Sequence, residues 1–467
     1  MKLKKNWNKA FCCALAASFV IGATGCMETA TSNVKLEDLY IPTYVDNGQR
    51  YIINCDTPPN MSIKEQAQLY KDAGFNSVQI TEDFFSAADV AKYGEDSAYI
   101  KALKVCEELG IDAYIRPHSG LISQTPTDAP CYYEQYFSTI DFRDYPAVKG
   151  FSLVDEPSLG QVNDLEARFL PWFNENYGGD GYEFYGNLFH AAHTASSGIG
   201  PSYNDYAEKW LSILDRADAV NKHFSIDFYT LHYKESTGYT MYEPNLKCHA
   251  DAAMRAKNHN MDFGGYVQAF GSTSGSSYRL PTTFAEINWG VYNLLSFGAT
   301  RLKFFLFREY KADNLLGLLT DGVPNERYYW TKEALEYVDK MDYVLLSYDW
   351  DHIYTNVGTG SRLATNEAFE YVRGISKPIT DVETVRSKYD ITMNEFTDAD
   401  GNKAFMLFNY DDPILGRNNK VKITFKDADG VLYYRKGEPT TQVLENKKFE
   451  IELESGEGVF VIPLYKK

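Results

Sequence analysis

Two adjacent carboxylates, Asp155 and Glu156, follow the apolar run at 148–154 and precede Pro157. A continuous apolar run indicates a buried parallel strand, and the proline ends it. In a (β/α)8 barrel the carboxyl end of such a strand lies on the catalytic face. The two acids repel each other, and an apolar wall raises the pKa of the nearer one, so one can stay protonated near neutral pH and act as a general acid. The same residues also fit an exposed acidic turn, and the surrounding pattern must decide between these interpretations.

Strand and helix patterns alternate from residue 51 onward, as in consecutive βαβ units. We expect eight strands separated by helices, at 51–55, 77–81, 111–116, 148–154, 185–189, 224–229, 266–270 and 301–307. Beyond about residue 345, alternating runs predict short antiparallel strands at 404–410, 420–425, 431–434 and 459–463. The predicted fold class is therefore α/β: a (β/α)8 TIM barrel followed by a small C-terminal antiparallel β-sandwich.

The first 26 residues resemble a bacterial lipoprotein signal. Four lysines precede an apolar segment at 10–21 that is too short to span a bilayer, and Ala23-Thr24-Gly25-Cys26 follows it. The resemblance implies cleavage before Cys26, a lipid on that cysteine, and a lipid-anchored protein of the cell envelope, on the periplasmic or surface face of the outer membrane. An ordinary signal peptide with an incidental cysteine is the alternative.

These patterns divide the chain into five parts. We expect a signal peptide at 1–25, a tether at 26–48, the barrel at 49–350, a connecting segment at 351–384 and the β-sandwich at 385–467.

Charge and motifs narrow the function. The chain has a net charge of −18, and loss of the four signal-peptide lysines makes it −22, which disfavours nucleic acid as a partner. Gly-x-x-x-x-Gly-Lys-Ser/Thr, Gly-x-Gly-x-x-Gly before a helix, and His-Glu-x-x-His are all missing from the sequence. We expect no nucleotide, dinucleotide or other cofactor.

The ordered set of strand-end motifs resembles bacterial glycoside-hydrolase-like barrels related to the β-galactosidase type, known as clan A. The likeness covers roughly residues 50–345 and rests on these segments: Asp155-Glu156-Pro157, Asn187-Leu188-Phe189, Asp227-Phe228-Tyr229, 267–271, 279–282 with Glu286 and Trp289, and 297–299. It implies a carbohydrate substrate and cleavage of a glycosidic bond in an oligo- or polysaccharide.

The resemblance also implies catalytic roles. Glu156 matches the strand-four acid of the clan and is our candidate general acid/base. The clan keeps a nucleophilic glutamate on strand seven, where this sequence has Gln268, and an amide cannot serve as the nucleophile. Asp227 after strand six or Glu309 after strand eight is then the second carboxylate.

Two alternatives remain at this stage. In hexosaminidases that use the 2-acetamido group of the substrate, an Asp-Glu pair ends strand four and a tyrosine assists, which Asp155, Glu156 and Tyr229 resemble. The missing strand-seven glutamate also allows a catalytically silent barrel that binds glycan.

Several other polar residues are candidates for substrate contacts. Arg116 and His118 end strand three and can hold sugar hydroxyls or a neighbouring carboxylate; a rim arginine that pairs structurally with an acid is the alternative. Asn187 can both donate to and accept from a diol, and Tyr229 can stack on a sugar ring. Gln268 completes this set. The spacing of His190 and His193 is typical of metal ligands, but without a nearby Glu it does not predict a metal site.

Overall fold

The computed structural model describes residues 34–81, 87–116, 140–234, 238–241, 245–272, 277–311, 314–356, 372–374 and 378–467. Cys26, the signal peptide predicted at 1–25 and His118 lie outside these ranges. Within the described residues, none of the helices combines the length and the apolar character that a membrane span requires.

Eight parallel strands form the barrel, which confirms the predicted fold class. Their order around the sheet is β1-β11-β9-β6-β5-β4-β3-β2. The strands are β1 (Ile52–Cys55), β2 (Ser77–Thr81), β3 (Asp112–Arg116), β4 (Val148–Asp155), β5 (Glu183–Leu188), β6 (His223–Ile226), β9 (Asp262–Gln268) and β11 (Ala299–Phe305). Asn76 joins β1 to β2. Its N–H donates to the carbonyl oxygen of Ile53, its side-chain oxygen accepts from the N–H of Ile53, and its amide donates to the carbonyl oxygen of Tyr51. The barrel is thereby nearly closed.

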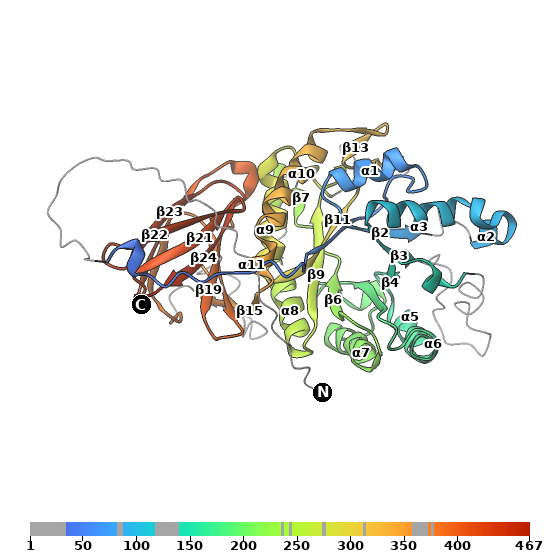
Figure 1. Ribbon diagram of the computed structural model, residues 1–467, viewed down its shortest axis with the longest axis horizontal. Helices are drawn as coiled ribbons and strands as arrows, with labels where there is room; N and C mark the ends of the chain where they lie inside the picture. The colour runs from blue at the N-terminus through green and yellow to red at the C-terminus, as the bar shows by residue number, and fades with distance from the viewer. Residues whose placement is uncertain are drawn as a thin grey trace. The chain divides into compact units, whose positions relative to one another are not determined.

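Helices surround the barrel strands, as Figure 1 shows. They are α1 (Lys64–Asp72), α2 (Ala87–Tyr93), α3 (Ala98–Leu109), α5 (Leu159–Asp164), α6 (Leu170–Asn176), α7 (Tyr203–Arg216), α8 (Asn245–Asn258), α9 (Phe284–Ser296), α10 (Glu326–Asp339) and α11 (Asp342–Leu345). Local signals set their ends. In α3 the Ser97 hydroxyl accepts from the N–H of Ile100, and Gly110 ends the helix at φ 64°. In α5, Ser158 and Gln161 form a capping box directly after Glu156 and Pro157.

Short paired strands lie in the loops between barrel elements. They are β7 (Leu231–Lys234) with β8 (Gly238–Met241), β10 (Gly271–Ser272) with β12 (Leu315–Leu316), and β13 (Leu319–Thr320) with β14 (Val323–Pro324).

The C-terminal part is a sandwich of two sheets. The seven-stranded sheet has the order β16-β15-β18-β19-β24-β21-β22, and the other sheet has the order β17-β20-β23. The strands are β15 (Tyr348–Thr355), β16 (Val372–Gly374), β17 (Val382–Ser387), β18 (Ile391–Asp398), β19 (Lys403–Asn409), β20 (Asn419–Phe425), β21 (Gly430–Arg435), β22 (Glu438–Val443), β23 (Lys448–Leu453) and β24 (Gly458–Leu464). All four predicted C-terminal strands are present. The predicted connecting segment 351–384 contains most of β15 and all of β16, so the large sheet reaches into it.

The barrel and the large sheet share one apolar core. Trp289 of α9 is fully buried and packs against Phe408 and Tyr410, with ring centroids 5.5 and 5.4 Å away. The Asn288 amide donates to the carbonyl oxygen of Gly456 at 2.9 Å. A separate apolar core fills the space between the two sheets, with Met393, Phe405 and Ile423 among its members. Helix α9 therefore supports the barrel and the sandwich together, as its place in Figure 1 shows.

Candidate active site

Glu156 stands at the carboxyl end of β4 in a strained backbone conformation. Its φ is +48°, in the left-handed region that non-glycine residues seldom adopt. The backbone holds it there, because the Glu156 N–H donates to the carbonyl oxygen of Asn187 at 2.7 Å and the Tyr206 hydroxyl donates to that of Pro157 at 2.8 Å. Such strain gathers where the position of a side chain matters to function.

Asp155 is held by two donors from neighbouring strands. The Arg116 guanidinium of β3 donates to its Oδ2 at 3.2 Å, and the Asn187 amide of β5 donates to its Oδ1 at 2.9 Å. Arg116 also donates to the amide oxygen of Gln79 at 3.0 Å. Two residues predicted to contact substrate, Arg116 and Asn187, therefore hold Asp155 in place.

Glu156 and Asp227 line one cavity of about 390 Å³. The other lining residues are His190, Ala192, His193, Thr194, Ser197, Tyr229, His232 and Tyr278. The cavity lies at the carboxyl ends of β4, β5 and β6, which is the catalytic face of a (β/α)8 barrel. The structure thus brings together Glu156, Asp227 and Tyr229 from the sequence prediction.

Burial and neighbouring negative charge raise the pKa of both cavity carboxyls, Glu156 and Asp227. The surrounding protein, and next the Asp155 carboxylate, raise the pKa of Glu156 to about 7. Burial raises the pKa of Asp227 well above its ordinary value, and the charges of Asp155 and Glu156 add to that effect. Like charges on coupled sites favour sharing of protons, so the two carboxyls tend not to be ionised together. A carboxyl that is protonated near pH 7 can donate a proton in catalysis.

Asp227 and Tyr229 form a polar corner backed by aromatic rings. The Asp227 N–H donates to the carbonyl oxygen of Leu188 at 2.8 Å, which fixes the residue at the end of β6. Its Oδ1 is buried and has no hydrogen-bond partner among the described residues. The Tyr229 ring lies 4.7 Å from that of Phe270 and 5.5 Å from that of Tyr278. Flat rings beside paired carboxyls are suited to binding a sugar.

Gln268 does not reach the cavity. Its side-chain oxygen accepts from the N–H of Leu231 at 2.8 Å, and its amide donates to the carbonyl oxygens of Leu231 and Arg279 at 2.9 and 3.0 Å. The residue is 4% exposed. Through these bonds the Gln268 amide holds Leu231 of β7 and the loop residue Arg279 against the end of β9. This differs from the predicted contact with substrate, because the backbone already uses its donors and its acceptor.

Glu309 also lies apart from Glu156. Its Oε1 is 3.1 Å from the Lys311 Nζ and accepts from the N–H of Asp321 at 3.2 Å. It is not among the described residues that line the Glu156 cavity. Of the two candidates for the second carboxylate, the structure brings only Asp227 to the cavity.

The histidines of the cavity are neutral groups near pH 7. Burial, and next the neighbouring histidines, lower the pKa of His190 to about 3, and burial lowers the pKa of His193. Their rings are 4.3 Å apart, and the His193 Nδ1 lies 2.8 Å from the Ser197 hydroxyl. Within the described part of the chain, no three His, Cys, Asp or Glu side chains are grouped as metal ligands.

Sequence reasoning missed the polar residues inside the barrel, chiefly Asp56 and Lys303. Asp56 follows β1, accepts from the Tyr266 hydroxyl at 2.7 Å, and has its pKa raised to about 6, mainly by burial. Lys303 is 2% exposed, and burial lowers its pKa to about 7. The signal for Lys303 is its place in β11, where Arg301, Lys303 and Phe305 alternate with Leu302 and Phe304. Period-two alternation places these three side chains on one face of the strand.

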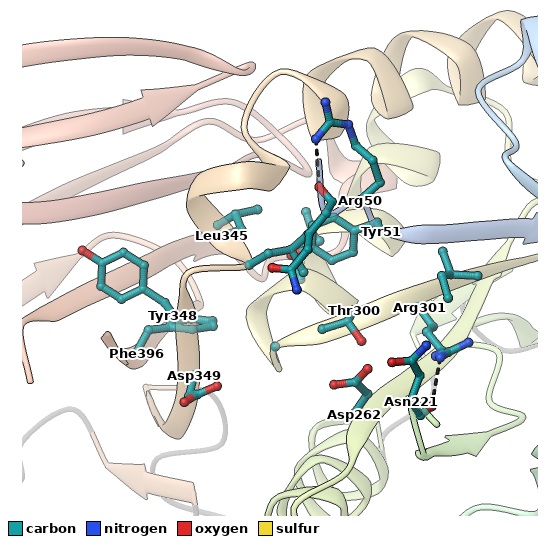
Figure 2. A pocket seen from close by; sticks show the side chains of 15 residues that line it. Arg50, Tyr51, Asn221, Asp262, Thr300, Arg301, Leu345, Tyr348, Asp349 and Phe396 are labelled. Atoms are coloured by element: carbon teal, nitrogen blue, oxygen red, sulfur yellow. Dashed lines mark hydrogen bonds between the residues drawn. The ribbon is translucent and has the colours of Figure 1, made fainter. Parts of the chain in front are cut away.

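A second cavity of about 350 Å³ lies at the amino ends of the barrel strands, where β1, β9 and β11 begin (Figure 2). Tyr51, Asp262 and Arg301 line it from the barrel side, and Tyr348 and Phe396 line it from the large sheet. The dashed bond from Arg301 in Figure 2 ends at the carbonyl oxygen of Asn221, at 3.0 Å. This end of a (β/α)8 barrel serves stability rather than chemistry.

Comparison with known proteins supports the fold. No protein-family model matches the sequence, and a search of curated proteins gives no significant match. A solved structure described as a glycoside hydrolase is similar with a TM-score of 0.53 at 9% identity, over 88% of this chain and 92% of its own. A family 5 glycoside hydrolase from Bacteroides vulgatus has a TM-score of 0.48 at 11% identity, over 88% and 89% of the two chains. A family 30 endoxylanase from Clostridium papyrosolvens has a TM-score of 0.45 at 12% identity, over 90% and 97%. The likeness to the first of these structures shows that the chain has a glycoside-hydrolase-type (β/α)8 barrel fold.

Proposed function

We propose that the protein hydrolyses glycosidic bonds in an oligo- or polysaccharide, with Glu156 as general acid/base and Asp227 as the second carboxylate. The observation that carries this proposal is that the two carboxyls line one cavity at the carboxyl ends of β4 and β6. Paired carboxyls on either side of a glycosidic bond are what glycoside hydrolysis requires. The fold adds support only as an analogy.

The raised pKa of Glu156 fits the role of acid. Near pH 7 about half of a group with this pKa carries its proton, which it can donate to the leaving oxygen as the C–O bond breaks. Asp227 lines the same cavity and, in its ionised form, would bond to the anomeric carbon. Because burial and the neighbouring acids raise the pKa of Asp227, it ionises most readily in the state in which Glu156 keeps its proton. Water that is deprotonated by Glu156 would then release the sugar and restore both carboxyls.

The acetamido scheme has weaker support. In that scheme Asp155 must turn toward the substrate amide, yet both of its oxygens accept from Arg116 or Asn187. Asp155 is also not one of the described residues that line the cavity with Glu156. We therefore assign it to the support of Glu156.

The decisive experiment compares Glu156→Gln and Asp227→Asn with the wild type on a panel of glycosides. Glu156→Gln should lower turnover by ~10²–10⁴ on natural leaving groups and by less on activated aryl glycosides, which need little protonation. Asp227→Asn should abolish turnover on every substrate, and azide should restore part of it by occupying the place of the nucleophile.

Glu309→Gln is the matched control, because Glu309 is an acid on the same end of the barrel that pairs with Lys311 outside the cavity. It should retain wild-type rates. Equal losses on activated and natural substrates would exclude Glu156 as the acid. A wild type that binds glycans without cleaving any of them would replace the proposal with a glycan-binding role.

We also propose that Cys26 carries a lipid that anchors the mature protein at the cell envelope. The support is the sequence alone: a basic segment, a short apolar segment, and small residues before the cysteine. A single acyl chain anchors weakly, so stable attachment needs the multiple acylation typical of lipoproteins. Cys26→Ala should lose metabolic labelling by a fatty acid and leave the membrane fraction, and retained label would refute the anchor.

A further inference from the structure

A chain of hydrogen bonds runs through the barrel interior from Lys303 to Asp155. The Lys303 ammonium donates to the Ser225 hydroxyl at 3.0 Å, and that hydroxyl donates to the Asn187 side-chain oxygen at 3.2 Å. The Asn187 amide then donates to the Asp155 carboxylate at 2.9 Å. The four residues come from β11, β6, β5 and β4, which are neighbouring or near-neighbouring barrel strands. Lys303, Ser225 and Asn187 are all buried.

Lys303 sets the direction of this chain. Below its pKa of about 7, Lys303 is an ammonium, which can only donate, so the Ser225 oxygen must accept from it and the Ser225 hydrogen must point elsewhere. That hydrogen meets the Asn187 oxygen, which turns the Asn187 amide toward Asp155. Without a donor below it, Ser225 can reverse its hydrogen, and Asn187 can flip its oxygen toward the carboxylate.

A second branch returns to Lys303 from the other oxygen of Asp155. The Arg116 guanidinium, which also can only donate, bonds to Asp155 and to the Gln79 side-chain oxygen. The Gln79 amide donates to the Tyr185 hydroxyl at 3.0 Å. The Tyr185 ring lies beneath the Lys303 ammonium, 3.8 Å from Nζ to the ring centroid, so the branch closes into a ring.

Charged and titratable groups face Lys303 from most barrel strands. The Asp56, Asp155 and Asp227 carboxylates favour its charged form, whereas burial and Arg301 oppose it. His223, Tyr185 and Tyr266 complete its surroundings. Because the interaction is mutual, the Lys303 charge also favours the ionised form of Asp227, the form required of a nucleophile.

We infer that Lys303 is a positioning residue for the carboxyl site: acting through Ser225 and Asn187, it orients Asp155 beside Glu156, and its charge stabilises the Asp227 carboxylate. This inference deepens the proposed hydrolase function and rests on it for its kinetic consequences. The electrostatic part has a readout that needs no turnover.

The test uses Lys303→Met and Ser225→Ala in the full chain, with circular dichroism and thermal melting to confirm folding. In both variants Asn187 loses the hydrogen bond that fixes the orientation of its amide. Both variants should therefore lower kcat/KM by ~10²-fold, the cost of a misplaced catalytic group. Only Lys303→Met removes a charge, so only it should move the acid limb of the pH–rate profile upward. Lys303→Arg, which keeps a donor-only cation, should restore the acid limb.

The second readout is carbodiimide labelling of carboxyls across pH, quantified at Asp227 by peptide mass spectrometry. The midpoint for Asp227 should rise in Lys303→Met and stay unchanged in Ser225→Ala. Lys64→Met, at an exposed lysine that pairs with Glu108, is the control and should match the wild type in both assays.

Three outcomes would overturn the inference. One is a folded Lys303→Met with the wild-type acid limb and the wild-type Asp227 labelling midpoint. Another is full activity in Ser225→Ala, an outcome that can be tested even if Lys303→Met does not fold. The third is strict additivity of Lys303→Met and Asn187→Ala, since members of one network must couple. If the wild type cleaves no glycoside, the proposed function fails, and the labelling midpoint alone decides the electrostatic role of Lys303.

Discussion

Replacing Asp155 with asparagine should lower the pKa of Glu156 and narrow the pH range of activity. The pKa of Glu156 rises from an ordinary 4.5 to about 7, with burial as the larger cause and the Asp155 charge as the smaller one. The charge therefore accounts for less than half of the rise, or under ~1.2 pH units. The substituted side chain would keep the size of the aspartate and an oxygen that accepts from Arg116 or Asn187.

The magnitude follows from the protonated fraction. If the pKa falls by about 1 to near 6, the protonated fraction of Glu156 at pH 7 drops from about one half to about one tenth. Protonation alone then reduces kcat/KM about fivefold at pH 7 and scarcely at pH 5.

The assay is kcat/KM from pH 4 to 9 on a glycoside with a natural leaving group. The midpoint of the alkaline limb should fall in Asp155→Asn. It should stay at the wild-type value in Asp112→Asn, which makes the same substitution at the amino end of β3. A midpoint that stays or rises in Asp155→Asn would refute the electrostatic role given to Asp155. A uniform loss at all pH values would instead indicate misplacement of Glu156.

The remaining predictions concern stability. Glu183→Gln breaks a buried pair with two N–H···O bonds from Arg301, at 2.9 and 2.6 Å, and should cost about 3–5 kcal/mol in urea unfolding. Glu166→Gln, at a half-exposed ion pair with Arg216, should lower the free energy of unfolding by under ~1 kcal/mol. Similar losses of unfolding free energy in Glu183→Gln and Glu166→Gln would contradict this reasoning. Burial lowers the pKa of His249 to about 4, so the folded state resists the proton that the unfolded chain binds below pH 6.5. This stability is present above pH 6.5 and is lost as the pH falls toward 4, by about 2.5 kcal/mol at pH 4.5. His249→Gln should remove that part of the acid destabilisation, and an unchanged slope of unfolding free energy against pH would count against it.

The barrel could be predicted from sequence because its strands are buried on both faces. Such strands appear as mainly apolar runs, with buried polar residues such as Arg301 and Lys303 among them, and each of the eight predicted runs overlaps an observed strand. Strands of the sandwich that lack this signal were missed. In β22 most side chains are exposed, and Pro439 interrupts the pattern, as is usual for an edge strand. In β15 a bulge between Trp350 and His352 breaks the period of two.

The site could be predicted only as far as strand ends reveal it. Glu156, Asp155 and Asp227 follow apolar runs, so position along the chain was enough to propose them. Periodicity gives the face of a strand on which a side chain lies, but not the partner that it meets. Arg116 was expected to hold sugar hydroxyls or a neighbouring carboxylate, and Asn187 to bind a diol. Both donate to Asp155, and their contact with substrate stays a prediction. His190 lies in the cavity on a loop and His232 on the short strand β7, and the sequence fixes the course of neither connection.

The absence of a strand-seven glutamate and the role proposed for Asp227 are consistent with one physical explanation. The Gln268 amide donates to the carbonyl oxygens of Leu231 and Arg279, and these bonds hold two loop segments against the end of β9. A carboxylate at this position would turn its oxygens toward both carbonyls with no hydrogen to offer, which is a costly arrangement for buried groups. The local structure therefore favours an amide here. In the proposed mechanism the second carboxylate then comes from a strand whose end opens into the Glu156 cavity, and Asp227 at the end of β6 meets that condition.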